Sequence, residues 1–338
     1  MKRIGNLFEQ IFSHENMYAA YLDARRGKRK KRACFLFDTQ AGTKLEELHT
    51  AIHAGTYQPV PYFKFTIYEP KERIIYAPAF EDIVVQHAIY RIINPIFNRT
   101  FIDQSYACRI GKGTHKASDY TQSALRKCDP ESYTLKLDIR KFFYSIDRAI
   151  LQRLIERVIK DQRLVAIMMQ FAAYEHPVGI PIGNLLSQLY ALIYLSPIDH
   201  YIKRELKVKL YCRYVDDFIL FGLTRKQCLE QRALIIAFIR DKLHLDLSKS
   251  TIAKVRRGVN FVGFRTWQSA RFIRKHSMFK FRRYVRKGRM EGIVSILGHA
   301  RKTASLPYLL NLLKEPRHGK NLQLPKSVRR LYQVHGIR

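Results

Sequence analysis

The sequence predicts an α+β fold in which helices back an antiparallel sheet, and three observations support this prediction. The first is an apolar run over residues 210–221 that is interrupted at its centre by Asp216 and Asp217, as expected for two short strands joined by a tight turn. The second is the order of strand-like and helix-like segments between residues 133 and 267. The third is the composition: 338 residues with 47% apolar side chains can bury a large core, in about two or three domains.

Local periodicity and capping residues predict the individual elements. Alternating β-favouring residues indicate a hairpin over residues 63–76 and strands over residues 133–138 and 258–267, the last with a tight bend at Gly263. Apolar residues at helical spacing indicate helices over residues 81–97, 147–160, 184–204 and 225–243. Asp147 is a plausible N-cap for the second of these helices. The buried face expected for the fourth helix consists of Leu229, Ala233, Ile236, Ile239 and Arg240.

The charge of the chain points to a nucleic-acid partner. Lys and Arg number 61 against 28 Asp and Glu, which gives a formal net charge of +33. No apolar stretch approaches the roughly 18 residues that a membrane span needs, so we expect no membrane contact. Residues 25–32 fit either a solvated charged loop or an arm that contacts phosphates. We favour the arm, formed by Arg25, Arg26, Lys28, Arg29, Lys30, Lys31 and Arg32.

The remaining composition excludes several kinds of site. Residues 271–338 contain no Asp and only Glu291 and Glu315, too few carboxylates for a metal-dependent RNase H or endonuclease domain. We expect a basic helical module that grips a duplex, with Arg282 and Arg283 among its contacts. The five cysteines are dispersed, and no histidine pairs with a second His or a Cys at metal-ligand spacing, so zinc is not expected. Reduced thiols and the lack of a secretory signal favour the cytoplasm.

The acidic residues are the candidates for chemistry. Asp216 and Asp217 repel each other when packed strands exclude water from them, and a divalent cation would offset that cost, although an ordinary acidic surface turn has the same appearance. Asp138 ends a strand about eighty residues earlier. If these strands are neighbours, the three carboxylates can hold two Mg²⁺ ions, or Mn²⁺, roughly 3.5–4 Å apart. Such a site performs phosphoryl transfer by positioning and electrostatics.

Six blocks in order resemble a reverse transcriptase over about residues 60–267. They are residues 71–78 with Asp82 and Gln86, then 106–113, 137–147, 214–217, 245–249 and 260–264. The resemblance implies a right-hand polymerase with fingers, palm and thumb, in which an antiparallel palm sheet is backed by helices and the thumb is helical and basic. It divides the chain into a basic N-terminal extension (1–60), fingers (61–134, with 170–190 contributing), palm (135–267) and helical thumb (268–338).

The resemblance also implies roles for single residues. Asp138 and Asp216 would be metal ligands, with Asp217 as a supporting acid. Residues that would bind the incoming deoxynucleoside triphosphate are Lys71 and Arg73 through its phosphates, Lys249 near them, and Phe143 against its sugar. An aromatic ring at Phe143 leaves no room for a 2′-hydroxyl, although ordinary core packing is an alternative. The hairpin that holds the primer would contain Asn260, Phe261, Gly263 and Phe264.

One block departs from the general family pattern. Most reverse transcriptases carry Gln-Gly-x-x-x-Ser-Pro where this chain has residues 182–188, so Ile182 replaces an amide near the template base and Gln188 replaces a proline. A pocket without that polar contact discriminates less between base pairs. The variant block resembles the reverse transcriptases of diversity-generating retroelements in phages and bacteria. These enzymes copy a template-repeat RNA with errors opposite adenine, and the mutated cDNA replaces part of a target gene.

That subgroup implies particular partners, and other assignments stay open. The partners would be the template RNA, its RNA/DNA hybrid, deoxynucleoside triphosphates and an accessory variability protein, itself a homo-oligomer. A group II intron or retron reverse transcriptase is the first alternative, against which Ile182 argues. A catalytically silent RNA-binding protein is the second. The retained Asp138, Asp216, Asp217 and Arg73 argue against it.

Overall fold

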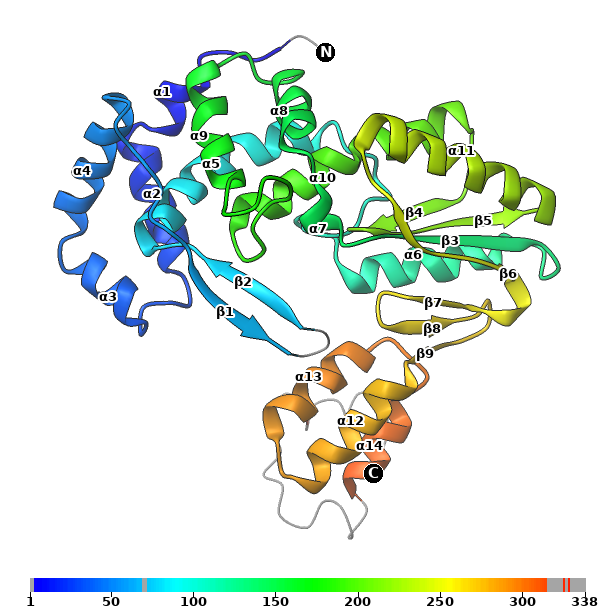
Figure 1. The fold of residues 1–338 in the computed structure, drawn as a ribbon. Helices are drawn as coiled ribbons and strands as arrows, with labels where there is room; N and C mark the ends of the chain where they lie inside the picture. Colours follow the sequence, from blue (N-terminus) through cyan, green and yellow to red (C-terminus); the bar gives the residue numbers. More distant parts are fainter. Residues whose placement is uncertain (1–2, 69–71, 315–324, 326–327, 329–338) are drawn as a thin grey trace. The chain divides into compact units, whose positions relative to one another are not determined.

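The computed structural model describes residues 3–68, 72–314, 325 and 328, and it divides into two compact units. Unit 1 consists of Met1–Asp103, Ile139–Lys207 and Ala233–Ser248, whereas unit 2 consists of Gln104–Asp138, Val208–Arg232 and Lys249–Arg338. Each unit therefore combines segments that are far apart in the sequence (Figure 1).

Unit 1 is mainly helical. Helix α10 is apolar on nearly every side, and it packs against α5, α8 and α9, as a helix without a polar face must do to leave water. A π-helical turn, η1 (Tyr201–Glu205), extends it. The helices of this unit are α1 (Leu7–Ile11), α2 (His14–Arg25), α3 (Arg32–Asp38), α4 (Ala41–His53), α5 (Phe80–Asn98), α7 (Phe142–Ser145), α8 (Arg148–Glu156), α9 (Gln162–Ala172) and α10 (Leu185–His200).

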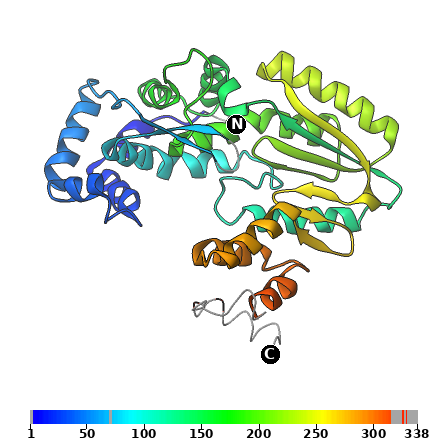
Figure 2. The same ribbon diagram turned by 60° about the horizontal axis from the view of Figure 1, so that its bottom comes forward.

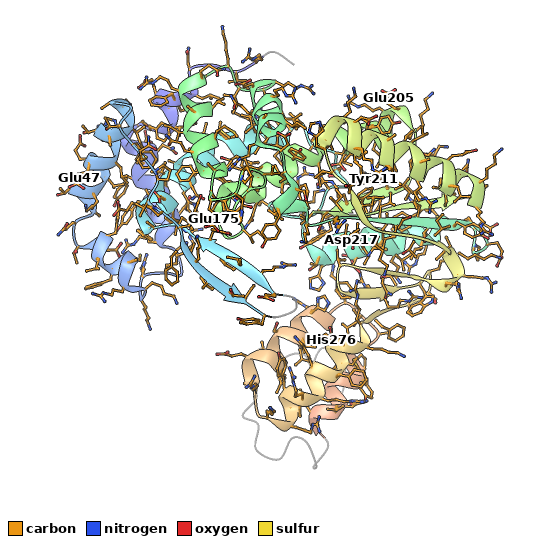
Figure 3. All side chains as sticks on the ribbon, viewed as in Figure 1. Glu47, Glu175, Glu205, Tyr211, Asp217 and His276 are labelled. Carbon is orange, nitrogen blue, oxygen red and sulfur yellow. The ribbon has the colours of Figure 1, made fainter. Side chains whose placement is uncertain are left out.

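The predicted hairpin is present in unit 1 as β1 (Phe63–Ile67) and β2 (Arg73–Ala77), which pair in antiparallel register. Tyr76 anchors it, because its side chain is buried and its hydroxyl donates to Oε1 of Glu175 at 2.8 Å. Lys64 on β1 forms an ion pair with the same carboxylate, which Figure 3 labels. The base of the hairpin is thus fixed to the segment that follows α9.

Unit 2 contains a four-stranded sheet in the order β4-β5-β3-β6. Its strands are β3 (Tyr133–Ile139), β4 (Tyr211–Tyr214), β5 (Asp217–Leu223) and β6 (Leu247–Lys254). Both β3 and β4 run antiparallel to β5. Helix α6 (Thr114–Arg126) packs against β4 and β5, and its Ala117, Ala124 and Leu125 share one apolar core with Cys212 and Ile219 of these strands.

A smaller antiparallel sheet follows, with β7 (Val259–Phe261), β8 (Phe264–Thr266) and β9 (Arg271–Ile273) in that order. Gly263 lies in the turn between the first two strands with a φ of +90°, so the predicted tight bend is confirmed. Three helices come next: α12 (Lys275–Arg286), α13 (Met290–Ala300) and α14 (Leu306–Lys314). They gather around an apolar core that includes Phe281, Ile293 and Leu309 (Figures 1 and 2).

The sequence predictions fail mainly at helix ends and on one helix face. Helix α8 begins after its N-cap Asp147 as predicted, but it ends at Glu156. Helix α11 (Arg225–Leu243) has the predicted bounds, whereas its predicted buried face is right only at Ile239: Leu229 is 44% exposed and Arg240 is exposed. The true face lies one position away along the same period, at Cys228, Ile235, Ile239 and Leu243. None of the helices in the described residues is long and apolar enough to span a membrane.

Candidate active site

The three predicted carboxylates lie at one end of the sheet in unit 2. Strands β3 and β5 are neighbours, and their register places Asp138 directly opposite Asp217. Strand β4 pairs with β5 through Tyr214 and Asp217, so Asp216 lies in the turn between them. Figure 3 labels Asp217 at this end of the sheet. The expectation that the acid-bearing strands are neighbours is therefore confirmed, and the carboxylates are crowded rather than dispersed.

Arg213 supports the turn that carries Asp216. Val215 has a φ of 55°, a left-handed conformation that is costly for a β-branched residue. Nη1 of the fully buried Arg213 donates to the carbonyl oxygen of Val215 at 2.9 Å. The Arg213 backbone is itself held between Gln104 and Tyr106, through two hydrogen bonds of 3.0 Å. The sequence signal, a charged residue within an apolar strand, was available but overlooked.

Lys136 is a second residue that the sequence analysis missed. It precedes Asp138 by two positions and so faces the same side of β3, and its Nζ lies 2.7 Å from Oδ2 of Asp217. Burial raises the pKa of Asp217 to about 6; Lys136 opposes this, whereas the charges of Asp138 and Asp216 add to it. Oδ1 of Asp217 is buried and accepts no hydrogen bond from the residues that the structure describes.

These features fit a divalent cation. The site offers oxygen ligands from three carboxylates, and one buried oxygen lacks a donor among the described residues. Hard cations such as Mg²⁺ take oxygen ligands and would neutralise the repulsion that one lysine only partly offsets. Asp138, Asp216 and Asp217 are thus the residues that could hold the metal.

A second group of predicted residues is assembled in unit 1 by backbone hydrogen bonds. The amide of Ile180 donates to the carbonyl of Phe143 at 2.8 Å, and the amide of Tyr76 on β2 donates to the carbonyl of Ile182 at 2.7 Å. At Gly183, with a φ of +124°, a Cβ would lie 2.9 Å from the carbonyl oxygen of Tyr76. Only glycine allows this approach, so the sequence of the block permits its contact with the hairpin.

Buried polar side chains form hydrogen bonds with the backbone of the variant block, residues 182–188. Oε1 of Gln86 accepts from the amides of Leu185 and Leu186 at 2.9 and 3.4 Å, at the start of α10. Asn184 caps the same helix, accepting from the amide of Ser187 at 2.7 Å, and its Nδ2 donates to the carbonyl of Phe171 at 3.0 Å. Gln86 and Asn184 therefore satisfy the backbone amides at the start of α10, next to Ile182.

The side chains in this group differ in exposure. Phe142 is only 2% exposed and belongs to the core, whereas its neighbour Phe143 is half-buried, which argues against plain core packing for Phe143. Ile182 is half-buried, and Gln188 and Arg73 are exposed. Lys71 lies outside the described residues.

The other predicted contacts are placed unevenly. Lys249 is exposed on β6, at the edge of its sheet. In the hairpin expected to hold the primer, Phe261 and Phe264 are 1% and 0% exposed, so their rings pack in the core. A primer could meet only the exposed Asn260 and the turn at Gly263. The aromatic pattern of this block reflects packing.

The basic arm runs from the end of α2 to the start of α3, and two of its members form ion pairs, one of them Arg26 with Asp23 at 3.4 Å. Nη2 of Arg25 binds Oδ2 of Asp38 at 2.8 Å, which removes Arg25 from the set available to phosphates. Lys28 is half-buried, and the other members are exposed: Arg26, Arg29, Lys30, Lys31 and Arg32. Arg282 and Arg283 are exposed on α12.

The expectation that no two histidines have metal-ligand spacing is wrong, because His49 and His53 lie four positions apart on α4. His14 on α2 and the pair Glu46 and His49 on α4 have ligand atoms within 4.8 Å of one another. The rings of His14 and His49 are stacked, however, with centroids 3.9 Å apart. Stacked rings direct their in-plane lone pairs side by side, which does not suit a shared ion, so we assign no site there.

The fold and the crowded carboxylates define a template-directed polymerase of the right-hand class, as expected from the sequence. Residues 69–266, more than half of the chain, match the reverse transcriptase (RNA-dependent DNA polymerase) family. The chain belongs to this family, and it is an RNA-directed DNA polymerase.

Relatives and solved structures agree with this assignment. Protein YkfC of Escherichia coli (strain K12) is 25% identical over 295 residues, which cover 72% of this chain and 75% of YkfC. The group II intron-encoded protein LtrA of Lactococcus lactis subsp. cremoris is 28% identical over 218 residues, 60% of this chain but 36% of LtrA. Telomerase from Candida albicans, solved with a fragment of telomeric RNA, has a TM-score of 0.51 at 14% identity and covers 82% of this chain. The match spans 58% of that telomerase chain and concerns the fold alone.

The crowding of the carboxylates predicts that removing one charge stabilises the metal-free protein and reduces its stabilisation by Mg²⁺. In EDTA, Asp217→Asn should raise the melting temperature, because it relieves repulsion and the buried unpaired oxygen; about 1 kcal/mol would give a shift of about 2–4 °C. Added Mg²⁺ should stabilise the wild type more than the variant, which lacks one anionic ligand. Thermal unfolding with the exposed Asp241→Asn as control measures both effects. Equal Mg²⁺ shifts in wild type and variant would contradict the assignment.

The contact between Arg213 and Val215 predicts a loss of rate without loss of folding. Arg213→Lys keeps the buried positive charge but not the planar donor group that reaches the Val215 carbonyl. We expect kcat to fall about tenfold or more, with little change in the KM for deoxynucleotides, because a slightly displaced turn misplaces Asp216. Steady-state primer extension is the measurement, and Arg240→Lys, at an exposed ion pair, is the matched control. An unchanged kcat would show that the turn does not need this donor.

Proposed function

We propose that this polymerase copies a template-repeat RNA with low fidelity at template adenines, and that the mutated cDNA serves targeted gene diversification (mutagenic retrohoming). The observation that carries the proposal is the environment of Ile182. Its carbonyl is bound by Tyr76 on β2, the strand that begins at Arg73, and two residues earlier Ile180 binds the backbone of Phe143. Strand β2 and the segments of Phe143 and Ile182, all expected near the incoming nucleotide, are thereby linked within unit 1.

An aliphatic side chain at position 182 offers no hydrogen bond to the template base or to the incoming nucleotide. Both ends of the Asn184 amide hold backbone or side-chain partners, and Oε1 of Gln86 accepts from two backbone amides. Selection of the base pair would then depend on shape, which gives modest discrimination because a misfit in an apolar pocket costs little.

The remaining residues have distinct roles in this proposal. Asp138, Asp216 and Asp217 would hold two Mg²⁺ ions, or Mn²⁺, which when bound activate the primer hydroxyl and neutralise the leaving phosphate. Arg73 would donate to the triphosphate, as would Lys71 and Lys249. Phe143 would pack against the sugar and exclude a 2′-hydroxyl. Each role is carried over from the family resemblance and is supported by the exposure of Arg73 and Lys249 and the partial exposure of Phe143.

The basic surfaces would bind the nucleic acid. We propose that the exposed residues of the arm and the exposed Arg282 and Arg283 of α12 contact the phosphates of the template RNA and its RNA/DNA hybrid. The division into N-terminal extension, fingers, palm and thumb is proposed with them. An accessory variability protein is expected from the resemblance to diversity-generating retroelements.

A group II intron type reverse transcriptase is the second candidate. The observation that favours it is the 28% identity with LtrA over 218 residues. This candidate predicts faithful copying, whereas the first predicts errors concentrated opposite adenine. The two therefore differ in a single measurable property of the product.

The proposal predicts that Ile182→Gln restores discrimination. Primer extension on a defined RNA template with Mg²⁺, followed by sequencing, should show about threefold to tenfold fewer errors opposite adenine, the equivalent of one hydrogen bond. Errors opposite other bases should change little. Val178→Gln introduces the same side chain at an exposed site in the preceding loop and is the matched control. Asp216→Asn should abolish synthesis and is the negative control.

Three outcomes separate the candidates. Adenine-specific errors in the wild type that fall in Ile182→Gln support the proposal. Faithful copying by the wild type supports the intron type. Adenine-specific errors that Ile182→Gln leaves unchanged would retain the activity but remove Ile182 as its cause.

A further inference from the structure

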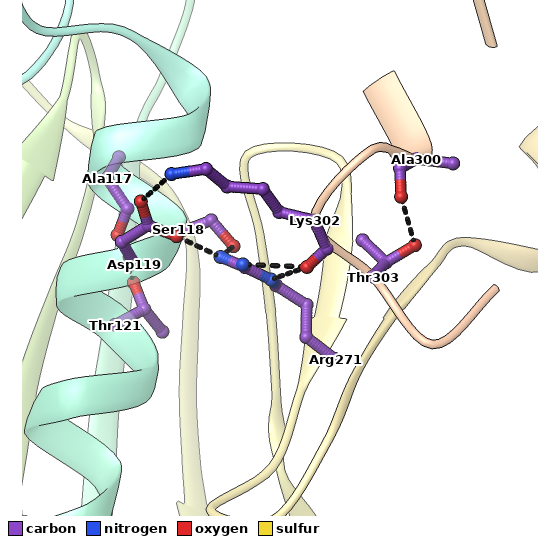
Figure 4. Close-up of polar contacts among 8 residues, drawn as sticks. All are labelled: Ala117, Ser118, Asp119, Thr121, Arg271, Ala300, Lys302 and Thr303. Atoms are coloured by element: carbon purple, nitrogen blue, oxygen red, sulfur yellow. Dashed lines mark hydrogen bonds and ion pairs between the residues drawn. The ribbon is translucent and has the colours of Figure 1, made fainter. Parts of the chain in front are cut away.

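Arg271 lies at a junction within unit 2, where β9 leads into the cluster of helices α12–α14 (Figure 4). Its side chain is 6% exposed. Nη1 donates to Oγ of Ser118 at 2.8 Å and to Oδ1 of Asp119 at 2.9 Å, both on α6. Nε and Nη2 donate to the carbonyl of Lys302, just after α13, at 3.2 and 2.8 Å. One guanidinium therefore bridges α6 and the helical cluster.

Lys302 closes the network from the other side. Its Nζ donates to Oδ2 of Asp119 at 2.9 Å, so each oxygen of this carboxylate accepts from a cation. Although burial opposes it, these hydrogen bonds hold the pKa of Asp119 below its usual value. The amide of Ala304 donates to the carbonyl of Arg271 at 2.9 Å, which fixes β9 to the segment between α13 and α14.

Helix α6 also supports the strands that carry the carboxylates. It packs against β4 and β5, which flank the turn at Asp216. The hydroxyl of Thr121 on α6 lies 3.9 Å from Sγ of Cys212 on β4. Helix α6 therefore contacts both Arg271, which precedes the helical cluster, and the strands on either side of the acidic turn.

A further contact, between β8 and α13, is less directional. His299 of α13 stacks on Phe264 of β8 with centroids 4.1 Å apart, and its Nε2 lies 3.4 Å from the carbonyl oxygen of Gly263. Stacked rings can slide past one another at little cost. The bidentate and charge-assisted bonds of Arg271 fix an angle as well as a distance.

We propose that Arg271, Asp119 and Lys302 form a positioning device that fixes the basic helices α12–α14 to α6 and thereby determines how long the enzyme retains its primer–template duplex between additions. The inference rests on the duplex-binding role proposed for these helices, and it is independent of the error pattern. None of the three side chains is assigned a contact with the nucleotide, so all three are positioning residues.

In the variant Asp119→Asn, a pure charge effect and a loss of positioning would change duplex binding in opposite directions. The change makes the protein more basic, so electrostatics alone would strengthen the binding of a phosphate backbone. If the network positions the helices, the variant should instead release the duplex about tenfold faster and yield shorter products in the presence of a heparin trap. The rate of a single nucleotide addition at saturating duplex should stay within about twofold of the wild type, because the acidic turn is untouched.

Glu131→Gln is the matched control for this test. Glu131 also accepts from two cations in unit 2, Lys254 and Arg256, and the change alters the net charge equally. It should retain the duplex at least as well as the wild type. Arg271→Lys is a second variant that keeps the net charge but cannot bridge Asp119 and the Lys302 carbonyl together, and it should also release faster.

The outcomes distinguish this inference from the proposed function. Duplex retention by Asp119→Asn equal to that of Glu131→Gln would overturn it. A parallel loss in the rate of single addition would overturn it as well, because the network would then act through the carboxylates. Faithful copying of adenine would overturn the proposed error pattern and leave the retention result intact.

Discussion

Three carboxylates crowded at the end of one sheet set the constraint from which the rest of unit 2 follows. Antiparallel pairing of β3 with β5 places Asp138 opposite Asp217, and a turn of only two residues places Asp216 next to them. Like charges in a partly dry site must be offset. Within β3 the chain supplies Lys136, which pairs with Asp217, and a metal would supply the remainder. Arg213 acts differently, because it donates to the Val215 carbonyl and so supports the turn that carries Asp216.

The backbone hydrogen bonds of residues 182–188 set a second constraint, in unit 1. A loop that passes between a hairpin and the Phe143 segment must satisfy its own backbone groups, and the amides of Gln86 and Asn184 are used for that purpose. Rigidity and base recognition compete for the same kind of side chain. With Oε1 of Gln86 and the Asn184 amide engaged in this way, the half-buried position 182 carries an apolar side chain, which is the feature on which the proposed loss of selectivity rests.

The sequence predicted what is local or carried by an ordered motif. The strand ending in Asp138, the hairpin over β1 and β2 and the cap at Asp147 depend on neighbouring residues and were found. Contacts across the fold were not: the pairing of Arg25 with Asp38 turns an apparent phosphate ligand into a structural bridge, and the burial of Phe261 and Phe264 makes apparent primer contacts part of the core. The face of α11 was misplaced by one position because helical periodicity fixes the spacing of a stripe better than its phase. Lys136 could have been found, since a strand places alternate residues on one face.

The distribution of acids explains why the helical cluster is fixed from outside. Residues 271–338 contain no Asp and only two Glu, so a module of this composition cannot pair its own cations and must bind a carboxylate that belongs to another element. Asp119 on α6 accepts Arg271 and Lys302, which lie next to the helices, while Arg282 and Arg283 on α12 remain exposed. A basic surface that faces a duplex is useful only if its own support does not consume the cations that contact phosphate. Pairing with Asp119 satisfies both demands, because the two cations that it uses, Arg271 and Lys302, lie outside α12.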